Sequence, residues 1–445
     1  MAVAVVEPAV EQTDILHPPP PVVTTPCDPW PRPYYLEDGL RRVAPYHYTY
    51  NTNVKERWRG RGILDIFRDE FRDRPEEYYK DAIETGKIQV NGHPLASLEA
   101  HVKNGDIISH TLHRHEPPVT AQPIGIVHED EDLIVINKPA GVPVHPAGRY
   151  NYNSVVEIMR AERGHQWNPL PCNRLDRLTS GIMFIGKHKK AAERMTDQLV
   201  SRTVRKEYVA RVRGEFPEDE VTCEQPILQI SPKLGLNRVR ANGKSAKTVF
   251  KRLAYYPPPP ATSTSSVNGQ ATSTIGGSGT GYSVVRCRPL TGRTHQLRVH
   301  LQFLGHPITN DPIYANRRVF GPSLGHSSVS ADDDEDVITR LGRMGKSEVA
   351  EAVAYEDEMV EEYNKKKAEK MTGELCELCD TPLYSDPGPQ ELGIYLHARR
   401  YADADGAWEY ETPLPAWALP PKGLDGPVEV TAESEPTADE GGKTL

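Results

Sequence analysis

The sequence predicts a mixed α+β fold built around a largely antiparallel sheet. Short segments rich in apolar residues are numerous, and many of them follow one another as hairpins. Helical patterns fall between them at irregular intervals, without the regular alternation that a doubly wound parallel sheet requires. With 445 residues the chain is also too long for one compact domain, so we expect two folded units with flanking tails.

The first folded unit is expected at residues 35–115, after a Pro-rich arm at 1–34 that we predict to be disordered. Apolar residues at helical spacing predict one helix over 63–71, and a second begins at Pro75 and ends near Glu84. A hairpin that turns at the Asn91-Gly92 pair follows. Two helices and a hairpin form a small α+β module.

The second unit is expected at residues 120–421, followed by a disordered acidic tail at 422–445. Two insertions interrupt it: a Pro, Ser, Thr and Gly segment at 257–281 and an acidic segment at 321–372. The predicted strands are 124–128, 133–137, 181–186, 206–212, 245–256, 282–289 and 393–401, and the predicted helices are 154–163, 189–201 and one that begins near Thr294.

The distribution of charge favours a polyanionic partner although the net charge does not. The chain has 53 basic and 62 acidic residues, a formal charge of −9, yet residues 174–318 hold 24 basic and 10 acidic residues. Within this segment, Lys187–Lys190, Arg202–Lys206 and Arg238–Lys247 are candidate contacts for an RNA backbone, the alternative being solvated surface.

The composition also bears on membrane spans and on the cellular compartment of the protein. No apolar run of about 18 residues is present, so we expect no membrane span. The first Arg is Arg32, which argues against a mitochondrial presequence, and the start of the chain lacks the basic region of a secretory signal. Six scattered cysteines fit a reducing compartment. We therefore expect a cytoplasmic or nuclear protein, with mitochondria disfavoured.

The stretch NRLDRLTSG at 173–181 carries the most informative chemistry. Asp176 lies between Arg174 and Arg177 at the entry to an apolar strand, where Gly181 relieves steric limits on the chain. Two neighbouring guanidinium groups favour an ionised carboxylate, as a nucleophile or base requires. Taken alone, the pattern favours an ordinary surface ion-pair cluster, since such pairs are common.

The stretch TGRTHQLR at 291–298 predicts a turn that opens a helix, with Thr294 as its cap. Arg293 and Arg298 would then lie close to His295, ready to pair with a buried carboxylate or to hold phosphate. His295 and His300 are five residues apart, which is off the spacing of a helical metal site.

These two stretches, together with KPAGVPVHP at 138–146 and RKEYVARV at 205–212, resemble the RluA-type family of RNA pseudouridine synthases. The four segments occur in the family's order. The resemblance implies the pseudouridine synthase fold for the second unit. Residues 62–112 resemble a degenerate S4-type RNA-binding module, through the run from Ile83 to Gly92.

The resemblance also implies roles for individual residues. Asp176 matches the catalytic aspartate, Arg174 the arginine that enters the stack when the base leaves, and Tyr208 the tyrosine that packs on the flipped uracil. Arg293 matches the basic residue paired with the catalytic carboxylate, and Leu297 an apolar pocket position. Asn173 stands where the family commonly has His. The candidate RNA-binding residues are Arg174, Arg177, Tyr208, Arg293 and Leu297.

The implied reaction is redox-neutral: the glycosidic N–C bond breaks and a C–C bond forms at the same sugar carbon. No cofactor is therefore expected. The carboxylate acts either by direct attack or by removing a sugar proton, and the residues do not choose between these routes. Base flipping costs a few kcal/mol, offset by stacking on an aromatic ring and by an inserted side chain.

Residues 45–75 and 376–401 resemble the eukaryotic branch that modifies uridine 32 of the tRNA anticodon loop. The expected partner is RNA, specifically tRNA, and the expected state is a monomer. Alternatives are the same reaction on ribosomal or messenger RNA, a non-catalytic RNA-binding protein on this fold, and a structural scaffold.

Cys376 and Cys379 form an isolated Cys-x-x-Cys pair. Zinc takes about four ligands, so His397 and another cysteine would have to complete a site. Two reduced thiols in a turn are the default expectation and zinc is the alternative.

Overall fold

The structure of the chain is a computed structural model that describes residues 30–71, 76–231, 235–258, 281–321, 323–330, 334–343, 371–388 and 391–427. It divides into two compact units. The first unit holds Ala44–His115 and the residues before Tyr34, and the second holds Tyr34–Val43 and the chain from Glu116 onwards. Most of the predicted arm, nearly all of the insertion at 257–281 and most of the acidic tail lie outside the described residues.

The first unit has the two predicted helices and the predicted hairpin. Helices α1 (Ile63–Glu70) and α2 (Glu76–Glu84) bury Ile66, Phe67 and Ile83 in one core with Ile88 and Ile108. The sheet has the order β3 (Tyr46–Asn53), β6 (Ile107–Arg114), β4 (Ile88–Val90) and β5 (His93–Pro94), all paired antiparallel.

Residues 35–43, which we placed in the first unit, form most of a hairpin that belongs to the second unit. Strands β1 (Tyr34–Glu37) and β2 (Leu40–Val43) form a three-stranded sheet with β7 (Val119–Thr120). The Arg41 side chain donates to Oδ1 of Asn153 over 2.5 Å, which ties the hairpin to the second unit. The turn residues Asp38 and Gly39 have φ of 51° and 74°, as a two-residue hairpin turn requires. The Asp-Gly pair was a readable signal for this hairpin.

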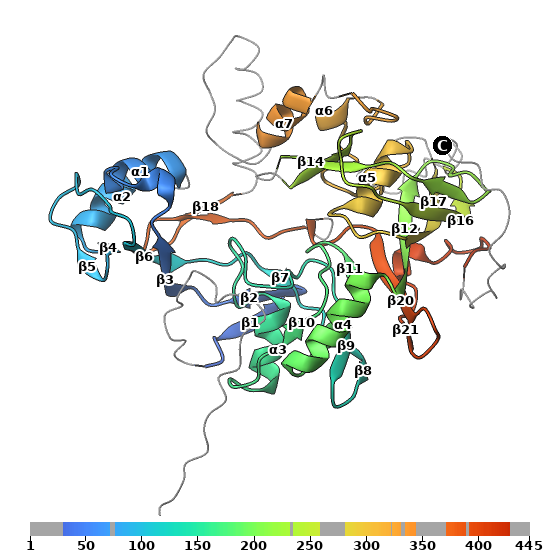
Figure 1. The fold of residues 1–445 in the computed structure, drawn as a ribbon, viewed down its shortest axis with the longest axis horizontal. Helices are drawn as coiled ribbons and strands as arrows, with labels where there is room; N and C mark the ends of the chain where they lie inside the picture. The colour runs from blue at the N-terminus through green and yellow to red at the C-terminus, as the bar shows by residue number, and fades with distance from the viewer. Residues whose placement is uncertain are drawn as a thin grey trace, which may run out of the picture. The chain divides into compact units, whose positions relative to one another are not determined.

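The second unit is built on a ten-stranded sheet, drawn in Figure 1. Its main order is β13-β16-β17-β12-β20-β11-β9-β8, with β10 paired to β11 and β21 to β20. Every pairing is antiparallel except that of β11 with β20, which confirms the predicted largely antiparallel α+β fold. The strands are β8 (Gly125–Glu129), β9 (Leu133–Lys138), β10 (Leu170–Pro171), β11 (Ser180–Gly186), β12 (Val204–Arg213), β13 (Val221–Cys223), β16 (Thr248–Tyr256), β17 (Tyr282–Pro289), β20 (Leu396–Asp403) and β21 (Glu409–Glu411).

Strand β11 is buried on both faces because helices pack against each side. Its Phe184 lies in a core with Ala191 and Met195 of α4 (Lys189–Ser201), whereas the adjacent Met183 lies in a core with Met159 of α3 (Val155–Arg163). A continuous apolar run, not an alternating one, is what such a strand requires. Helix α5 (Gln296–Phe303) covers the neighbouring part of the sheet, where its Leu297 and Leu301 share a core with β12 and β17.

The described part of the insertion at 321–372 is integrated into the second unit. Helix α7 (Asp334–Arg343) buries Val337 against Val299 of α5. The Asp334 carboxylate pairs with Arg238 and with Arg240, beside the hairpin of β14 (Ile227–Ser231) and β15 (Leu236–Val239). Helix α6 (Arg317–Phe320) precedes it, and a hairpin of β18 (Met371–Leu375) and β19 (Pro382–Tyr384) follows.

This arrangement corrects the interpretation of Arg238–Lys247 as one backbone-binding group. Arg238 and Arg240 are each 2% exposed, and their guanidinium groups are occupied by Asp334. Sequence counting cannot separate an exposed arginine from a buried one, because the acidic partner is more than 90 residues further along the chain.

Candidate active site

Asp176 lies on the loop between β10 and β11, held by tight backbone packing. Gly181, at the start of β11, has φ of 113°, a conformation that disfavours any side chain. A β-carbon there would overlap the backbone of Ala398 on the parallel strand β20. The glycine therefore lets β20 approach the end of the loop, as the sequence suggested. The Asp176 side chain remains 34% exposed.

Lys138, at the end of β9, holds the same loop in place. Its fully buried Nζ donates to the carbonyl oxygens of Pro139 and Val142, each over 2.9 Å, and of Arg177 over 3.2 Å. Burial lowers the pKa of Lys138 to about 7. Because the bond to Arg177 falls on the residue after Asp176, Lys138 fixes the backbone that presents the carboxylate.

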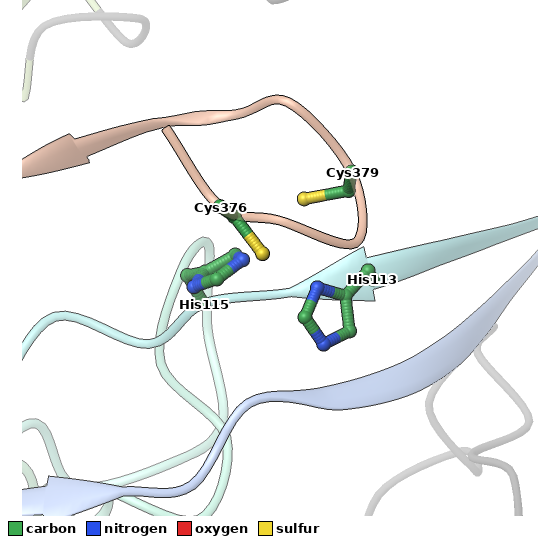
Figure 2. A group of neighbouring side chains, drawn as sticks. All are labelled: His113, His115, Cys376 and Cys379. Atoms are coloured by element: carbon green, nitrogen blue, oxygen red, sulfur yellow. The ribbon is translucent and has the colours of Figure 1, made fainter. Parts of the chain in front are cut away.

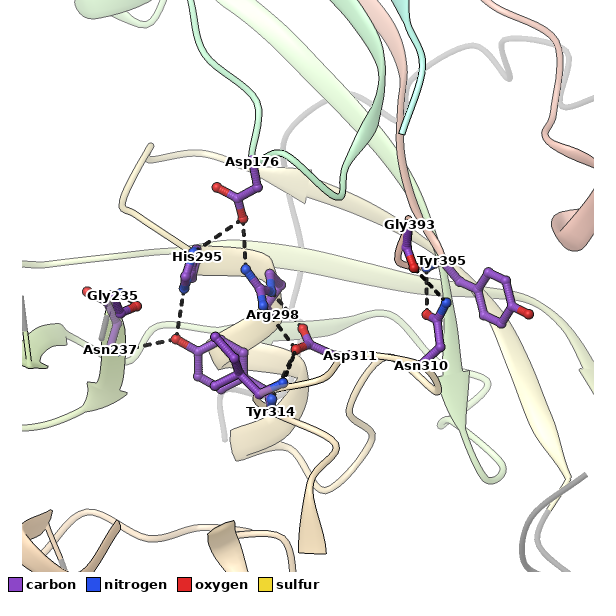
Figure 3. Close-up of polar contacts among 11 residues, drawn as sticks. Asp176, Gly235, Asn237, His295, Arg298, Asn310, Asp311, Tyr314, Gly393 and Tyr395 are labelled. Atoms are coloured by element: carbon purple, nitrogen blue, oxygen red, sulfur yellow. Dashed lines mark hydrogen bonds and ion pairs between the residues drawn. The ribbon is translucent and has the colours of Figure 1, made fainter. Parts of the chain in front are cut away.

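Arg298 is the arginine that pairs with Asp176, as Figure 3 shows. Its Nη1 donates to Oδ2 of Asp176 over 3.0 Å. Its Nε and Nη2 donate to the two oxygens of Asp311, over 2.6 and 3.0 Å. Burial alone would lower the pKa of Arg298, but the charges of Asp311 and Asp176 outweigh it and raise that pKa. The guanidinium is thus a permanently charged bridge between a buried carboxylate and an accessible one.

The prediction that Arg293 pairs with the candidate carboxylate is therefore wrong. The Arg293 Nε donates to the carbonyl of Ser245 over 2.9 Å, at an exposed position. The predicted cap at Thr294 is also replaced, since α5 begins at Gln296 with His295 at its N-cap position. The side chain of Gln296 accepts from the Arg293 N–H over 3.0 Å and so shapes the turn.

His295 lies on the other side of the same carboxylate oxygen. Its Nε2 is 3.5 Å from Oδ2 of Asp176, and its Nδ1 is 3.0 Å from the hydroxyl of Tyr314. Burial, aided by the charge of Arg298, lowers the pKa of His295 in spite of the two nearby carboxylates. His300, one turn further on, is bonded at both nitrogens, to Thr248 and to the carbonyl of Gln225.

Tyr208 and Leu297 share one apolar cluster of the second unit, on β12 and α5. A register shift between Glu207 and Tyr208 in the pairing of β12 with β20 alters the direction of the strand at this point. The Tyr208 hydroxyl lies 2.5 Å from that of Tyr401, and burial raises the pKa of Tyr208 to about 12. Tyr208 is thus a neutral, oriented ring.

The two arginines beside Asp176 differ in their surroundings. Arg174 is exposed, and within the described part of the chain it has no ion-pair partner. Arg177 donates to the carbonyl of Gly141 over 3.4 Å and lies 5.6 Å from the ring centre of Tyr150. Asn173 accepts a bond from the N–H of Phe184 over 2.9 Å and so supports the loop.

Sequence reasoning missed three members of this site. Lys138 begins the stretch KPAGVPVHP, whereas Asp311 and Tyr314 follow the stretch TGRTHQLR, and nothing in their spacing marks them as partners of Asp176 or of Arg298. No local signal shows which of these side chains are buried together, so the sequence could not have found them.

The site therefore holds a partly exposed carboxylate that is fixed by a buried arginine, near the neutral ring of Tyr208, and enzymes use such a carboxylate as an acid, a base or a nucleophile. Residues 132–303 match the family model described as RNA pseudouridylate synthase. The chain belongs to this family, in its RluA-type group, and is an isomerase that acts on uridine in RNA.

Individual relatives support the same assignment. The chain is 44% identical over 395 residues to the tRNA pseudouridine(32) synthase, mitochondrial, of Saccharomyces cerevisiae, covering 86% of this chain and 78% of the relative. It is 40% identical over 435 residues to human pseudouridylate synthase RPUSD2, covering 86% and 74%. It is 32% identical over 424 residues to the tRNA pseudouridine(31) synthase of S. cerevisiae, covering 86% and 96%.

The expectation of a cytoplasmic or nuclear protein is overturned by the first of these relatives, which is a mitochondrial enzyme. The expectation rested on the absence of arginine before Arg32, and a missing presequence pattern is weak grounds for location. Among the described residues, no helix has the length and apolar character to cross a membrane.

Cys376 and Cys379 lie on the turn between β18 and β19, where the Cys379 N–H donates to the Cys376 carbonyl over 3.3 Å. His397 is not available to them, because its nitrogens are bonded to Ser180 over 2.8 Å and Thr412 over 2.7 Å. Figure 2 draws the two thiols with His113 and His115 of the first unit, and these side chains are of the types that structural zinc takes as ligands. The default of two reduced thiols stays a prediction.

Proposed function

We propose that the protein converts uridine to pseudouridine at position 32 of the tRNA anticodon loop, in mitochondria, with Asp176 as the essential carboxylate. One observation carries the assignment of the residue: Asp176 is held by a buried arginine yet keeps 34% of its side chain exposed to an incoming nucleotide. The position in tRNA is supported by the relative that shares 44% identity, against 32% for the tRNA pseudouridine(31) synthase.

The geometry indicates a role for each residue of the site. Arg298 holds the Asp176 carboxylate in place through a hydrogen bond of 3.0 Å, so that the carboxylate can attack the sugar or remove a sugar proton. The ring of Tyr208 and the side chain of Leu297 supply an apolar wall for the flipped uracil. Arg174, exposed and two residues before Asp176, is placed to enter the stack that the base has left. Loop bases of the anticodon are already partly unstacked, which reduces the cost of flipping.

The test is a map of pseudouridine in mitochondrial and cytoplasmic tRNA from cells that lack the protein, with wild type or Asp176→Asn restored. We expect the mark at position 32 to disappear without the protein, to return with wild type, and to stay absent with Asp176→Asn. Persistence of the mark in the deletion refutes the substrate. Full restoration by Asp176→Asn refutes the role of Asp176.

The same map separates the rival substrates. Loss of pseudouridine from ribosomal or messenger RNA, with tRNA unchanged, replaces the proposed substrate with one of these RNAs. Fractionation of the cells used for the map tests the location, and recovery of the protein outside mitochondria only would contradict that part of the proposal.

A further inference from the structure

The backbone of His295 is held in a conformation that histidine rarely adopts. Its φ is 57° and its ψ 20°, in the left-handed region, at the N-cap position of α5. Its side chain makes no capping bond to the helix. Such strain persists only where surrounding contacts determine it, and it concentrates at functional sites. The contacts here are those with Asp176 and Tyr314.

The hydrogen bonds around Tyr314 fix which nitrogen of His295 carries the proton. The Asn237 N–H donates to the Tyr314 hydroxyl over 3.2 Å, so that oxygen already accepts one bond. The hydroxyl is fully buried and must place its own hydrogen on an acceptor. The Asn237 side chain also bonds this hydroxyl, as a donor, so the acceptor in reach among the described residues is Nδ1 of His295, 3.0 Å away. A neutral His295 then carries its hydrogen on Nε2.

That assignment directs a donor at the candidate catalytic carboxylate. The Nε2–H of His295 faces Oδ2 of Asp176 at 3.5 Å, the oxygen that also accepts from Arg298. Hydrogen bonds of catalytic groups are often this long before substrate binds. Figure 3 shows the relay from Asn237 through Tyr314 and His295 to Asp176.

We propose that His295 is a positioning residue of the isomerisation, in its Nε2–H tautomer set by Tyr314, and that it orients the Asp176 carboxylate. This inference rests on the proposed role of Asp176. The charged and titratable groups that face His295 are Asp176 on the β10–β11 loop, Arg298 on α5, and Asp311 and Tyr314 after that helix. Burial, followed by the charge of Arg298, lowers the pKa of His295 and outweighs the two carboxylates, so the ring is neutral.

Two substitutions at His295 separate its two nitrogens. His295→Gln carries an amide N–H near the position of Nε2, whereas His295→Asn reaches only as far as Nδ1. Single-turnover rates are measured with the full-length protein and a tRNA transcript that the wild type modifies. We expect His295→Asn to lower the rate by about tenfold to hundredfold, less than loss of an oxyanion-hole donor because Arg298 remains. His295→Gln should retain a rate several times that of His295→Asn.

Rescue by His295→Gln and RNA affinity distinguish positioning from a structural role. A higher rate in His295→Gln than in His295→Asn requires a donor near the position of Nε2, which a purely structural role does not. RNA affinity and melting temperature should stay near wild type in both variants. Tyr314→Phe, which removes the group that fixes the tautomer, should lower the rate by a smaller amount than His295→Asn.

Several outcomes would overturn the inference: a wild-type rate in His295→Asn, equal rates in His295→Gln and His295→Asn, or a loss confined to RNA affinity. Asp176→Asn, measured in parallel, keeps the two proposals apart. If Asp176→Asn is inactive while His295→Asn is fully active, only the role of His295 fails. If Asp176→Asn is active, the proposed function of Asp176 fails.

Discussion

Two arginine–carboxylate clusters of the second unit are built alike and differ in what they leave accessible. In one, Arg298 joins the fully buried Asp311 to Asp176, whose side chain is 34% exposed. In the other, Arg238 and Arg240 enclose Asp334, which is only 14% exposed. The first cluster leaves its second carboxylate accessible, whereas the second cluster satisfies its charges internally and holds α7. The sequence shows neither difference, because the exposure of the acid depends on the fold.

The largest effect is expected from Arg298→Met. The substitution leaves Asp311 fully buried without a counter-charge, which costs about 3–5 kcal/mol of folding free energy. It also removes the donor to Asp176, so the single-turnover rate should fall by about a hundredfold or more. Chemical denaturation and single-turnover kinetics on the fraction that remains folded measure the two losses. If Arg298→Met kept wild-type activity, the role of Arg298 would be structural only.

A smaller effect is expected from Arg240→Met, which is the matched substitution in the cluster around Asp334. Asp334 keeps its bond from Arg238 over 2.9 Å, so we expect a loss of about 1–3 kcal/mol in folding free energy. The rate of the folded enzyme should stay within about twofold of wild type, because no group of this cluster contacts Asp176. A hundredfold loss of rate in a folded Arg240→Met protein would erase the distinction between the clusters.

The third expected effect is a dependence of folding stability on pH, and it concerns Lys138, a buried side chain that is held by carbonyl oxygens. Its pKa is lowered from 10.5 to about 7, so above pH 7 the folded protein holds Lys138 neutral while the unfolded chain keeps it protonated up to about 10.5. Between these values the unfolded state binds more protons, and the contribution of Lys138 makes folding stability rise with pH.

Lys138→Met should lack this contribution. The stability of wild type relative to the variant should therefore increase from pH 7 to pH 10, by on the order of 1 kcal/mol per pH unit. Urea denaturation at several pH values measures it, and Arg240→Met serves as the control that keeps the wild-type slope. Parallel curves for wild type and Lys138→Met would mean that Lys138 is not desolvated as the structure implies.

The sequence by itself determined the main elements of the catalytic core and the reaction class. The apolar run at 181–186 predicted a strand, and the pattern at 189–201 predicted a helix, because both patterns are local. Four motif stretches in order, with Asp176 at the strand entry, were enough for the family. The Asp38-Gly39 pair is a local sequence signal for the hairpin at 34–43, but no local pattern indicates that this hairpin pairs with β7.

Only the tertiary structure decided which side chains meet. Arg293 and Arg298 stand in the same motif, five residues apart, and nothing in their spacing says that the second one reaches Asp176, 122 residues earlier in the chain. The tautomer of His295 likewise depends on a hydroxyl from Tyr314 and a backbone N–H from Asn237, which belong to other segments. Secondary structure follows from local pattern, whereas charge pairing and proton placement depend on burial and on contacts between distant segments, which the folded chain alone establishes.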